Sequence, residues 1–410
     1  METQLPENTD KTMPPAQAYH NVVILGAGAS FDAGIPLLPS FVDTMWEYAI
    51  RGKVGEKPLS KKDMEILGAA NKIRIDLDSY NSRASFDNRN LEDILSLLSF
   101  EALGDQRQTE NYKTMVRAIA RTIELSCKIR HLEQTPVAPI PLSTPYHRLW
   151  SHLLNGPLTR NNLPALITFN YDLVLERTLW ESFHRRDRGT PKPVVNSCGL
   201  KYFFGESDFS IKRVPHKYSI SQGPQLVSEE NGDKAQYILN EKTEADIPYF
   251  KLHGSLNWPQ QNPTIRPATP PTQVVDDPLI LPPVFNKMNT PLVETVWKGA
   301  LEVLRKAKNI IVVGYSLPRT DIYMQYFLKA AVGPNSDLHK IIVFNPALFK
   351  DNNEAQEMKN RYLECFSPQF SKRINFSPPH HYRGNSDARG TFEHFIHALE
   401  HFPKDLMFFP

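Results

Sequence analysis

The chain has 410 residues, 40% of them hydrophobic, which suffices for one large α/β domain with an accessory region or for two modest domains. Its formal net charge of +2 at pH 7 does not indicate a nucleic-acid partner, and no apolar run is long enough to cross a bilayer. The three cysteines form no C-x-x-C pair, which argues against a disulfide framework and excludes a four-cysteine zinc site within one chain. We therefore expect a cytoplasmic protein that has no bound metal and binds neither membrane nor nucleic acid.

Five short aliphatic, β-branched runs bounded by turn residues predict buried parallel strands. They are Asn21–Leu25, Ala165–Phe169, Tyr249–Leu252, Asn309–Val313 and Lys340–Phe344. Most are separated by long, helix-rich stretches, as the crossover connections of parallel strands require. The sequence thus predicts an α/β fold with a Rossmann-like, doubly wound parallel sheet at about residues 20–350.

Other segments interrupt or flank this core. We expect a flexible leader at 1–19, a large helical insertion at about 45–145, a smaller irregular or β-hairpin insertion at about 187–246, a Pro-rich extended loop at Gln260–Pro283 and a C-terminal helical extension at 351–410. The leader is polar and lacks the apolar core of a signal peptide. Helices are predicted at Leu91–Ala102, with Asn90 as N-cap, at Tyr112–Arg130 and near Thr391–His401.

Each predicted strand runs into small or polar residues. These endings are Gly26-Ala27-Gly28-Ala29-Ser30, Asn170-Tyr171-Asp172, His253-Gly254-Ser255, Gly314-Tyr315-Ser316 and Asn345-Pro346. In an open parallel sheet, ligands bind beyond the carboxyl ends of the strands. Five such endings from distant parts of the chain predict a shared polar crevice.

The first ending resembles a phosphate-binding turn. Gly26 and Gly28 permit a tight turn and close approach of a pyrophosphate, and a helix starting near Ala29–Phe31 would offer amides and a positive dipole. The third glycine comes late, at Gly34, which departs from the dinucleotide fingerprint of dehydrogenases. A purely structural glycine turn is the alternative.

The polar residues at the other strand ends also have two interpretations. Asn170 and Asp172 are two apart and can point the same way to contact a ribose or carboxamide, yet either can simply cap the next helix. His253 can accept a proton from a sugar hydroxyl, or serve as a structural residue. Gly314, Ser316 and Asn345 likewise suit a ligand site or a turn and helix cap.

In order and relative spacing, these segments resemble the sirtuin-like superfamily. The matching motifs are GAGASFDAGIP (Gly26–Pro36), TFNYD (Thr168–Asp172), KLHGS (Lys251–Ser255), VGYSLPRTD (Val313–Asp321) and VFNP (Val343–Pro346). The resemblance implies a Rossmann-like fold that binds NAD as substrate.

Carried over residue by residue, the resemblance implies three groups of roles. The catalytic residues are Asn170, which orients ribose hydroxyls or water, Asp172, which contacts the carboxamide, and His253, the general base. The residues that bind the pyrophosphate and nearby ribose come from the first motif: Gly26, Ala27, Gly28, Ser30 and Gly34. The residues that line the adenosine side are Gly314, Ser316 and Asn345.

Two departures separate the chain from protein-deacylating sirtuins. Leu37, Leu38 and Pro39 replace the Asp-Phe-Arg that follows the GIP motif in those enzymes, and Ser255–Val313 contains no cysteine for their zinc module. The chain is more similar to the sirtuin-like NADases of bacterial anti-phage systems. That resemblance implies hydrolysis of NAD to nicotinamide and ADP-ribose, without a metal, by an Asn–Asp–His set.

Three rival functions remain at this point. They are an NAD-dependent dehydrogenase, which the helical pattern at Phe41–Arg51 disfavours, a zinc-free deacylase or ADP-ribosyltransferase, and a non-catalytic NAD or ADP-ribose sensor. An NADase must be kept inactive until it is needed, yet the chain has no ATPase loop and no recognition motif for nucleic acid. The resemblance implies a separately encoded partner, a HerA-type ATPase in preference to a short Argonaute, and a symmetric homo-oligomer.

Overall fold

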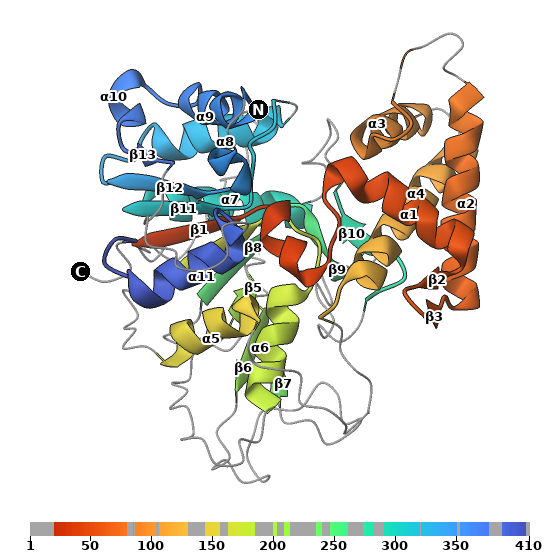
Figure 1. The fold of residues 1–410 in the computed structure, drawn as a ribbon, viewed down its shortest axis with the longest axis horizontal. Coiled ribbons are helices and arrows are strands. Elements are labelled where there is room, and N and C mark those ends of the chain that lie inside the picture. Colours follow the sequence, from red (N-terminus) through yellow and green to blue (C-terminus); the bar gives the residue numbers. More distant parts are fainter. Residues whose placement is uncertain are drawn as a thin grey trace, which may run out of the picture.

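The protein is built on one large mixed sheet (Figure 1). The computed structural model describes residues 20–79, 85, 87–103, 106–129, 144–155, 163–184, 200–202, 209–213, 235–239, 247–260, 274–281, 291–319, 321–350, 353–376 and 388–406. Within them the sheet has nine strands in the order β13-β12-β11-β1-β4-β8-β5-β6-β7. The strands are β1 Asn21–Leu25, β4 Ala165–Thr168, β5 Leu200–Tyr202, β6 Phe209–Arg213, β7 Ala235–Leu239, β8 Ile247–Lys251, β11 Asn309–Val313, β12 Lys340–Phe344 and β13 Ile374–Asn375.

All pairings from β13 to β5 are parallel, and only β6 and β7 add antiparallel strands at one edge. This confirms the predicted α/β, Rossmann-like sheet, and each of the five predicted strands is present within two residues of its expected ends. Both faces of β1, β4, β8 and β11 are buried, which explains why their sequences are mostly apolar.

The register of the sheet aligns the ends of the five strands. Leu25 pairs with Thr168 and Val313, Thr168 pairs with Lys251, and Val313 pairs with Phe344. These five residues are the last of their strands, so every polar motif that follows a strand starts from the same edge of the sheet.

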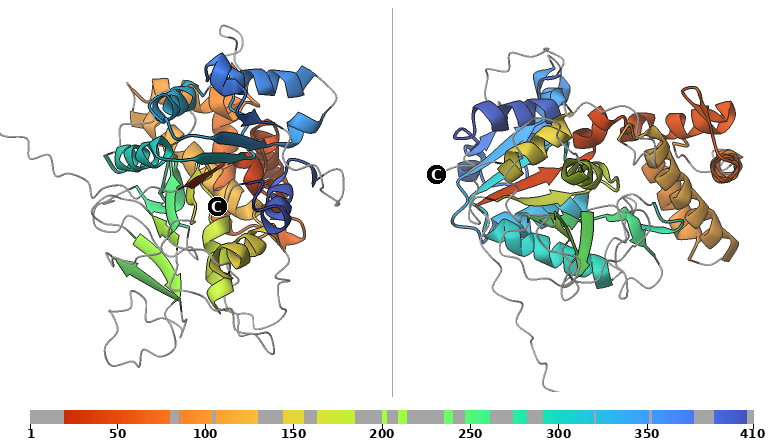
Figure 2. Two further views of the ribbon diagram at one scale, coloured as in Figure 1. Left: turned by 90° about the vertical axis from the view of Figure 1, so that its left-hand side faces the viewer. Right: turned by 90° about the horizontal axis from the view of Figure 1, so that it is seen from below.

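Helices cover both faces of the sheet (Figure 2). The helices on one face are α5 Pro145–Asn155, α6 Val174–His184 and α11 Phe392–His401, and those on the other are α7 Pro291–Arg305 and α8 Ile322–Val332. After β12 the chain forms the 3-10 helix η3 Pro346–Phe349 and the helices α9 Asn353–Leu363 and α10 Pro368–Ser371. Arg148 on α5 pairs with Glu393 and Glu400 on α11, which joins two helices that are distant in sequence. The C-terminal helix was predicted within one residue, and the structure shows Thr391 as its N-cap.

The helical insertion forms a separate lobe beside the carboxyl edge of the sheet (Figure 1). Its elements are α1 Leu38–Arg51, the hairpin strands β2 Lys53–Val54 and β3 Lys57–Pro58, α2 Lys61–Asp78, α3 Leu91–Glu101 and α4 Gln106–Ser126. Asn90 caps α3 as predicted, because its side chain accepts a hydrogen bond from the Glu92 amide at 2.9 Å. The insertion contacts the core through ion pairs between Arg177 and Glu124 at 2.9 Å and between Arg117 and Asp277 at 2.6 Å.

Three local predictions need correction. The helix expected to start near Ala29–Phe31 is a seven-residue 3-10 helix, η1 Ala27–Ala33, which begins directly after Gly26 and ends at Gly34 in the left-handed region. The helix expected at Tyr112–Arg130 is α4, which begins at Gln106 and ends at Ser126. The loop expected at Gln260–Pro283 contains a short strand, β10 Pro278–Ile280, which pairs antiparallel with β9 Gly254–Pro259.

In the described part of the chain, no helix combines the length and the apolar character needed to cross a membrane.

Candidate functional site

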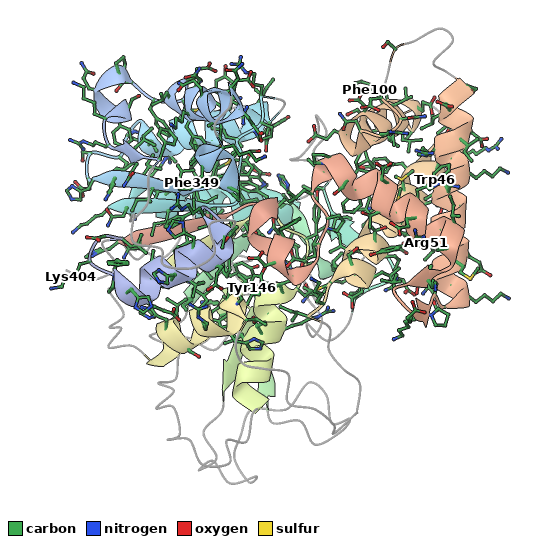
Figure 3. The ribbon with its side chains drawn as sticks, in the orientation of Figure 1. Trp46, Arg51, Phe100, Tyr146, Phe349 and Lys404 are labelled. Atoms are coloured by element: carbon green, nitrogen blue, oxygen red, sulfur yellow. The ribbon has the colours of Figure 1, made fainter. Side chains whose placement is uncertain are left out.

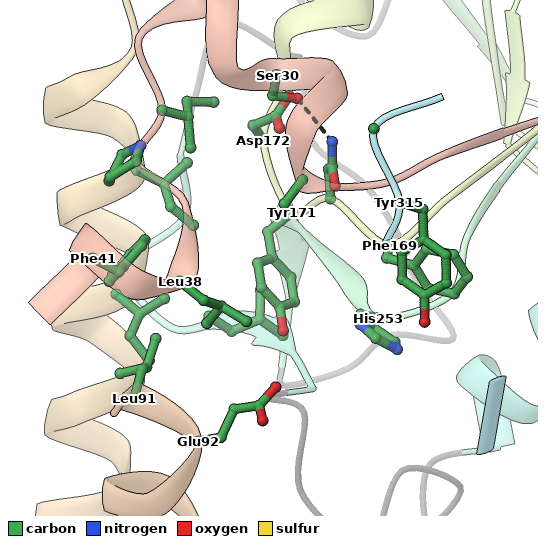
Figure 4. A pocket seen from close by; sticks show the side chains of 18 of the residues that line it. Ser30, Leu38, Phe41, Leu91, Glu92, Phe169, Tyr171, Asp172, His253 and Tyr315 are labelled. Carbon is green, nitrogen blue, oxygen red and sulfur yellow. Dashed lines mark hydrogen bonds between the residues drawn. The ribbon is translucent and has the colours of Figure 1, made fainter. Parts of the chain in front are cut away.

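A deep cavity lies where the carboxyl edge of the sheet faces the insertion (Figure 4). Its empty volume is about 1060 Å³, counting the part that is open to solvent. The side chains on its sheet side follow the strands: Ala27, Ser30, Phe169, Asn170, Tyr171, Asp172, His253, Gly314, Tyr315, Ser316 and Asp321. The side chains on its opposite wall are mostly apolar and come from the first connection and the insertion: Ile35, Pro36, Leu38, Phe41, Leu91, Glu92, Leu95, Ile119 and Ile123. The cavity therefore has one polar and one apolar side.

The glycines of the first motif pack against the loop after β11. A Cβ atom on Gly26 would lie 2.6 Å from the carbonyl oxygen of Gly314, and one on Gly28 would lie 2.9 Å from the Gly314 Cα. The Gly28 amide also donates to the Gly314 carbonyl at 2.9 Å. The contact between the two loops thus accounts for Gly26 and Gly28 without any ligand, and neither residue lines the cavity. Their predicted contact with a pyrophosphate stays a prediction.

The helix η1 is anchored from below by Tyr146 on α5 (Figure 3). The Tyr146 hydroxyl donates to the Ala29 carbonyl at 2.8 Å and accepts from the Ala33 amide at 3.2 Å. Burial raises the pKa of this hydroxyl well above its usual value, so it stays a neutral donor and acceptor. The anchor fixes Ser30, which faces the cavity from the same helix.

Asn170 lies at the centre of the polar side. Its side-chain nitrogen donates to the Gly26 carbonyl at 2.9 Å and to the Ser30 hydroxyl at 2.8 Å, the second of which is drawn in Figure 4. A carbonyl oxygen can only accept, so the atom beside it must be the amide nitrogen. Both amide hydrogens are therefore used, and the Asn170 side-chain oxygen is left to accept from a hydroxyl or a water.

Asp172 caps a helix and also lies at the wall of the cavity. One carboxylate oxygen accepts from the Val174 amide at 3.0 Å, which caps α6, and the side chain is buried at the cavity wall. The cap fixes the carboxylate in place, where a carboxamide N–H could donate to it. The two interpretations of Asp172 are compatible.

His253 lies among aromatic rings at the end of β8. Its ring centroid is 5.2 Å from that of Phe169, 6.2 Å from that of Trp297 and 6.3 Å from that of Tyr171, and its side chain is buried. The neighbouring Gly254 has φ of +85°, and a Cβ there would lie 1.9 Å from the Leu279 carbonyl oxygen. This glycine is needed because β10 approaches closely, and the approach of β10 closes the site behind the imidazole.

The loop after β11 brings Gly314 and Ser316 to the cavity. The Tyr315 ring stacks on Phe169 at 4.7 Å, and its hydroxyl donates to the Asp321 carboxylate at 2.7 Å. Burial, together with the Asp321 charge, raises the pKa of Tyr315 well above its usual value. Leu317 has a positive φ of 49° and is fully buried, so this loop holds a conformation that is rare for a non-glycine residue.

Two other predicted binding residues lie outside the cavity. Asn345 caps η3 by accepting from the Ala347 amide at 3.0 Å. Gly34 ends η1 with φ of +91°, and a Cβ there would lie 2.8 Å from the Ser126 carbonyl oxygen at the end of α4. The helix cap explains why residue 345 is an asparagine, and the close contact explains why residue 34 is a glycine. No finding tests their predicted contact with NAD.

The cavity also contains residues to which the sequence patterns assigned no role. Tyr171 and Tyr315 lie between the polar residues of their motifs. An aromatic residue within a polar run is the sequence signal that could have identified them as cavity residues. Ile119 and Ile123 lie on α4, and no signal near them indicated that they face a ligand site. Glu92, in the first turn of α3, points into the hollow (Figure 4).

Among the described residues, no group of three or more histidine, cysteine, aspartate or glutamate side chains is placed to hold a metal ion. The absence of zinc stays a prediction.

Part of the chain is similar to a known domain family. Residues 164–366 match the model of the SIR2-like domain, a range that includes the loops with Asn170, His253 and Gly314. The first motif lies before this range, but β1 pairs with β4 and β11 inside it. A search of curated proteins found no match. SIR2-like domains use NAD as substrate, and the similarity of residues 164–366 to such a domain supports a relation of this chain to the sirtuin-like family.

Proposed function

We propose that this protein is an NAD glycohydrolase, which cleaves the bond between nicotinamide and ribose to give nicotinamide and ADP-ribose. The observation that carries the proposal is the convergence of Asn170, Asp172 and His253 on one cavity at the carboxyl edge of the sheet. Asn170 and Asp172 follow β4, His253 follows β8, and the SIR2-like match covers all three. A sensor that only binds NAD requires no such set.

The charges of the cavity suit the nicotinamide end of NAD. Among the described lining residues there are three carboxylates, those of Glu92, Asp172 and Asp321, and there is no lysine or arginine. The nicotinamide ring of NAD carries a positive pyridinium charge, whereas the pyrophosphate is negative. A mostly apolar cavity with carboxylates at its wall favours a flat cationic ring over a phosphate.

The proposed reaction needs no metal. The electron pair of the C1′–N bond leaves with nicotinamide, which departs as a neutral molecule without general-acid help. The ribose C1′ becomes oxocarbenium-like, and a water molecule adds to it and releases a proton. Asn170 presents the side-chain oxygen that would hold a ribose hydroxyl or this water, and His253 is the base that would take up the proton.

The test is chromatography of NAD after incubation with the purified chain, alone and with a candidate ATPase partner. We expect nicotinamide and ADP-ribose from the activated protein, and loss of turnover in His253→Ala and in Asn170→Ala. His339→Ala is the matched control, because His339 is exposed and precedes β12 at the opposite edge of the sheet. Full activity in both site variants would refute the assignment.

One observation favours a second candidate, a zinc-free deacylase. The wall formed by Leu91, Leu95, Ile119 and Ile123 could accommodate an aliphatic acyl chain. Incubation with NAD and an acyl-lysine peptide distinguishes the two, since a deacylase releases nicotinamide only when the peptide is present. An ADP-ribosyltransferase would instead leave ADP-ribose attached to the acceptor.

We further propose that NAD depletion serves anti-phage defence. The support is the resemblance of the motifs, above all Val313–Asp321, to the sirtuin-like NADases of such systems. The proposed control is a separately encoded HerA-type ATPase, with a short Argonaute as the second choice, acting on a homo-oligomer of this chain. Co-purification and light scattering test this, and a monomer with high unaided NADase activity would argue against partner control.

A further inference from the structure

A buried lysine lies directly behind the candidate catalytic loop. Lys251 is the last residue of β8, and its side chain has an exposed fraction of 0%. Its ammonium pairs with the Glu176 carboxylate at 2.8 Å, and that side chain also has an exposed fraction of 0%. The ammonium donates to the backbone carbonyls of Asp172 and, at 3.4 Å, Tyr171. One cation thus joins α6, β8 and the loop that presents Asn170 and Asp172.

The Glu176 side of this pair is held by a second contact. The Tyr202 hydroxyl on β5 donates to the same Glu176 oxygen at 2.8 Å, while the other oxygen is buried with no hydrogen-bond partner in the described part of the chain. Burying two charges costs several kcal/mol of desolvation each, and their attraction often repays it only in part. Stability alone is therefore a weak reason for this pair.

The position of the ammonium suggests a different reason. The Tyr171 carbonyl also accepts from the Leu256 amide at 3.0 Å and from the Ser255 hydroxyl at 3.4 Å. These bonds hold the carbonyls of the loop toward the interior, on the side opposite the cavity. The side chains of Tyr171 and Asp172 face the cavity, and His253 follows Lys251 by only two residues.

We propose that Lys251 is a positioning residue, whose ammonium holds the Asn170–Asp172 loop in register with His253. The proposal rests on the proposed NAD hydrolysis for its kinetic consequence, but its structural part can be measured without turnover. A loop misplaced by about 1 Å costs on the order of a hundredfold in rate when it carries groups that orient the reactants.

The test compares Lys251→Met with the double variant Lys251→Met/Glu176→Gln. The single variant leaves a carboxylate buried without its cation, so it should unfold at lower denaturant concentration. The double variant removes both charges and keeps the acceptor for Tyr202, so it should recover most of that loss. If Lys251 positions the loop, kcat for NAD should stay about tenfold or more below wild type in the double variant while KM changes less.

Hydrogen exchange provides a readout that is independent of activity. In the double variant, the amides of residues 170–174 and of Leu256, which donates to the Tyr171 carbonyl, should exchange faster than in wild type. The amides of β1 should be unchanged. This result would support the positioning role even for a chain that does not hydrolyse NAD, so failure of the proposed function and failure of this inference are distinguishable.

The matched control is the ion pair made by the next residue of α6, Arg177, with Glu124 on α4. Arg177 and Glu124 lie 2.9 Å apart with exposed fractions of 3% and 18%, and they join α6 to the insertion and not to the Asn170–Asp172 loop. Arg177→Met/Glu124→Gln should change stability but leave exchange at residues 170–174 as in wild type. Recovery of both kcat and exchange protection in the Lys251→Met/Glu176→Gln variant would overturn the proposal and leave the pair a structural one.

Discussion

The contact between the two glycine loops can be tested by adding one carbon atom at Gly314. Gly314 has φ of +67°, and a Cβ there would lie 2.2 Å from the Ala29 nitrogen and 2.5 Å from the Gly28 carbonyl carbon. The left-handed conformation costs an alanine about 1–2 kcal/mol. Forcing apart two packed backbone segments adds about 1–3 kcal/mol. Gly314→Ala should therefore lower the free energy of unfolding by about 2–5 kcal/mol.

Gly55 is the matched control for this substitution. It has a similar φ of +57°, but an added Cβ would have no atom within 4 Å. Gly55→Ala should show only the conformational cost of about 1–2 kcal/mol, and it should keep its activity because the turn lies far along the insertion. The assays are urea unfolding followed by circular dichroism and release of nicotinamide from NAD. Equal losses of stability in the two variants would refute the close approach of the loops, as would full activity in Gly314→Ala.

Three further predictions concern charge, pH and metal content. Glu92→Gln should weaken binding of the cation 1-methylnicotinamide several-fold more than binding of neutral nicotinamide. Asp93→Asn is the control, because Asp93 lies outside the cavity wall, and it should not show this difference. Equal effects of Glu92→Gln on both compounds would contradict recognition of the positive charge. Burial lowers the pKa of His152 below its usual 6.5, so the unfolded chain binds this proton more readily than the folded protein. The free energy of unfolding should therefore fall as the pH drops from about 7 to about 5, and His152→Gln should flatten that part of the curve. Elemental analysis of the purified protein should find no stoichiometric zinc; one zinc ion per chain would contradict the cysteine argument.

The strands and caps were predictable because their signals are local. Asn21–Leu25 and Asn309–Val313 are apolar after their first residue and are followed by glycine, and both match the observed strands residue for residue. Asn90 precedes an apolar-periodic run with acidic residues in its first turn, and it caps α3 as such a residue should. Because parallel strands end at one edge, the gathering of Asn170 and His253 also followed from the sequence.

The sequence did not show why particular positions carry a glycine or a buried lysine, because these residues are required by contacts between distant segments. Gly26 is a glycine because the loop at Gly314 passes against it, and those residues are 288 positions apart. The same holds for Gly254, which meets β10 in a stretch whose proline content suggested only a loop. Lys251 shows the limit most clearly, since a lysine at a strand end usually reaches solvent, yet this one is fully buried.

The place of β1 in the sheet has a consequence for protein synthesis. β1 is made first among the strands, yet it lies between β4 and β11, and the cavity uses residues as late as Asp321. A ribosome must therefore release more than three-quarters of the chain before the walls of the cavity can meet. Nascent chains and products of premature termination before β11 lack part of the site, so we expect them to be inactive.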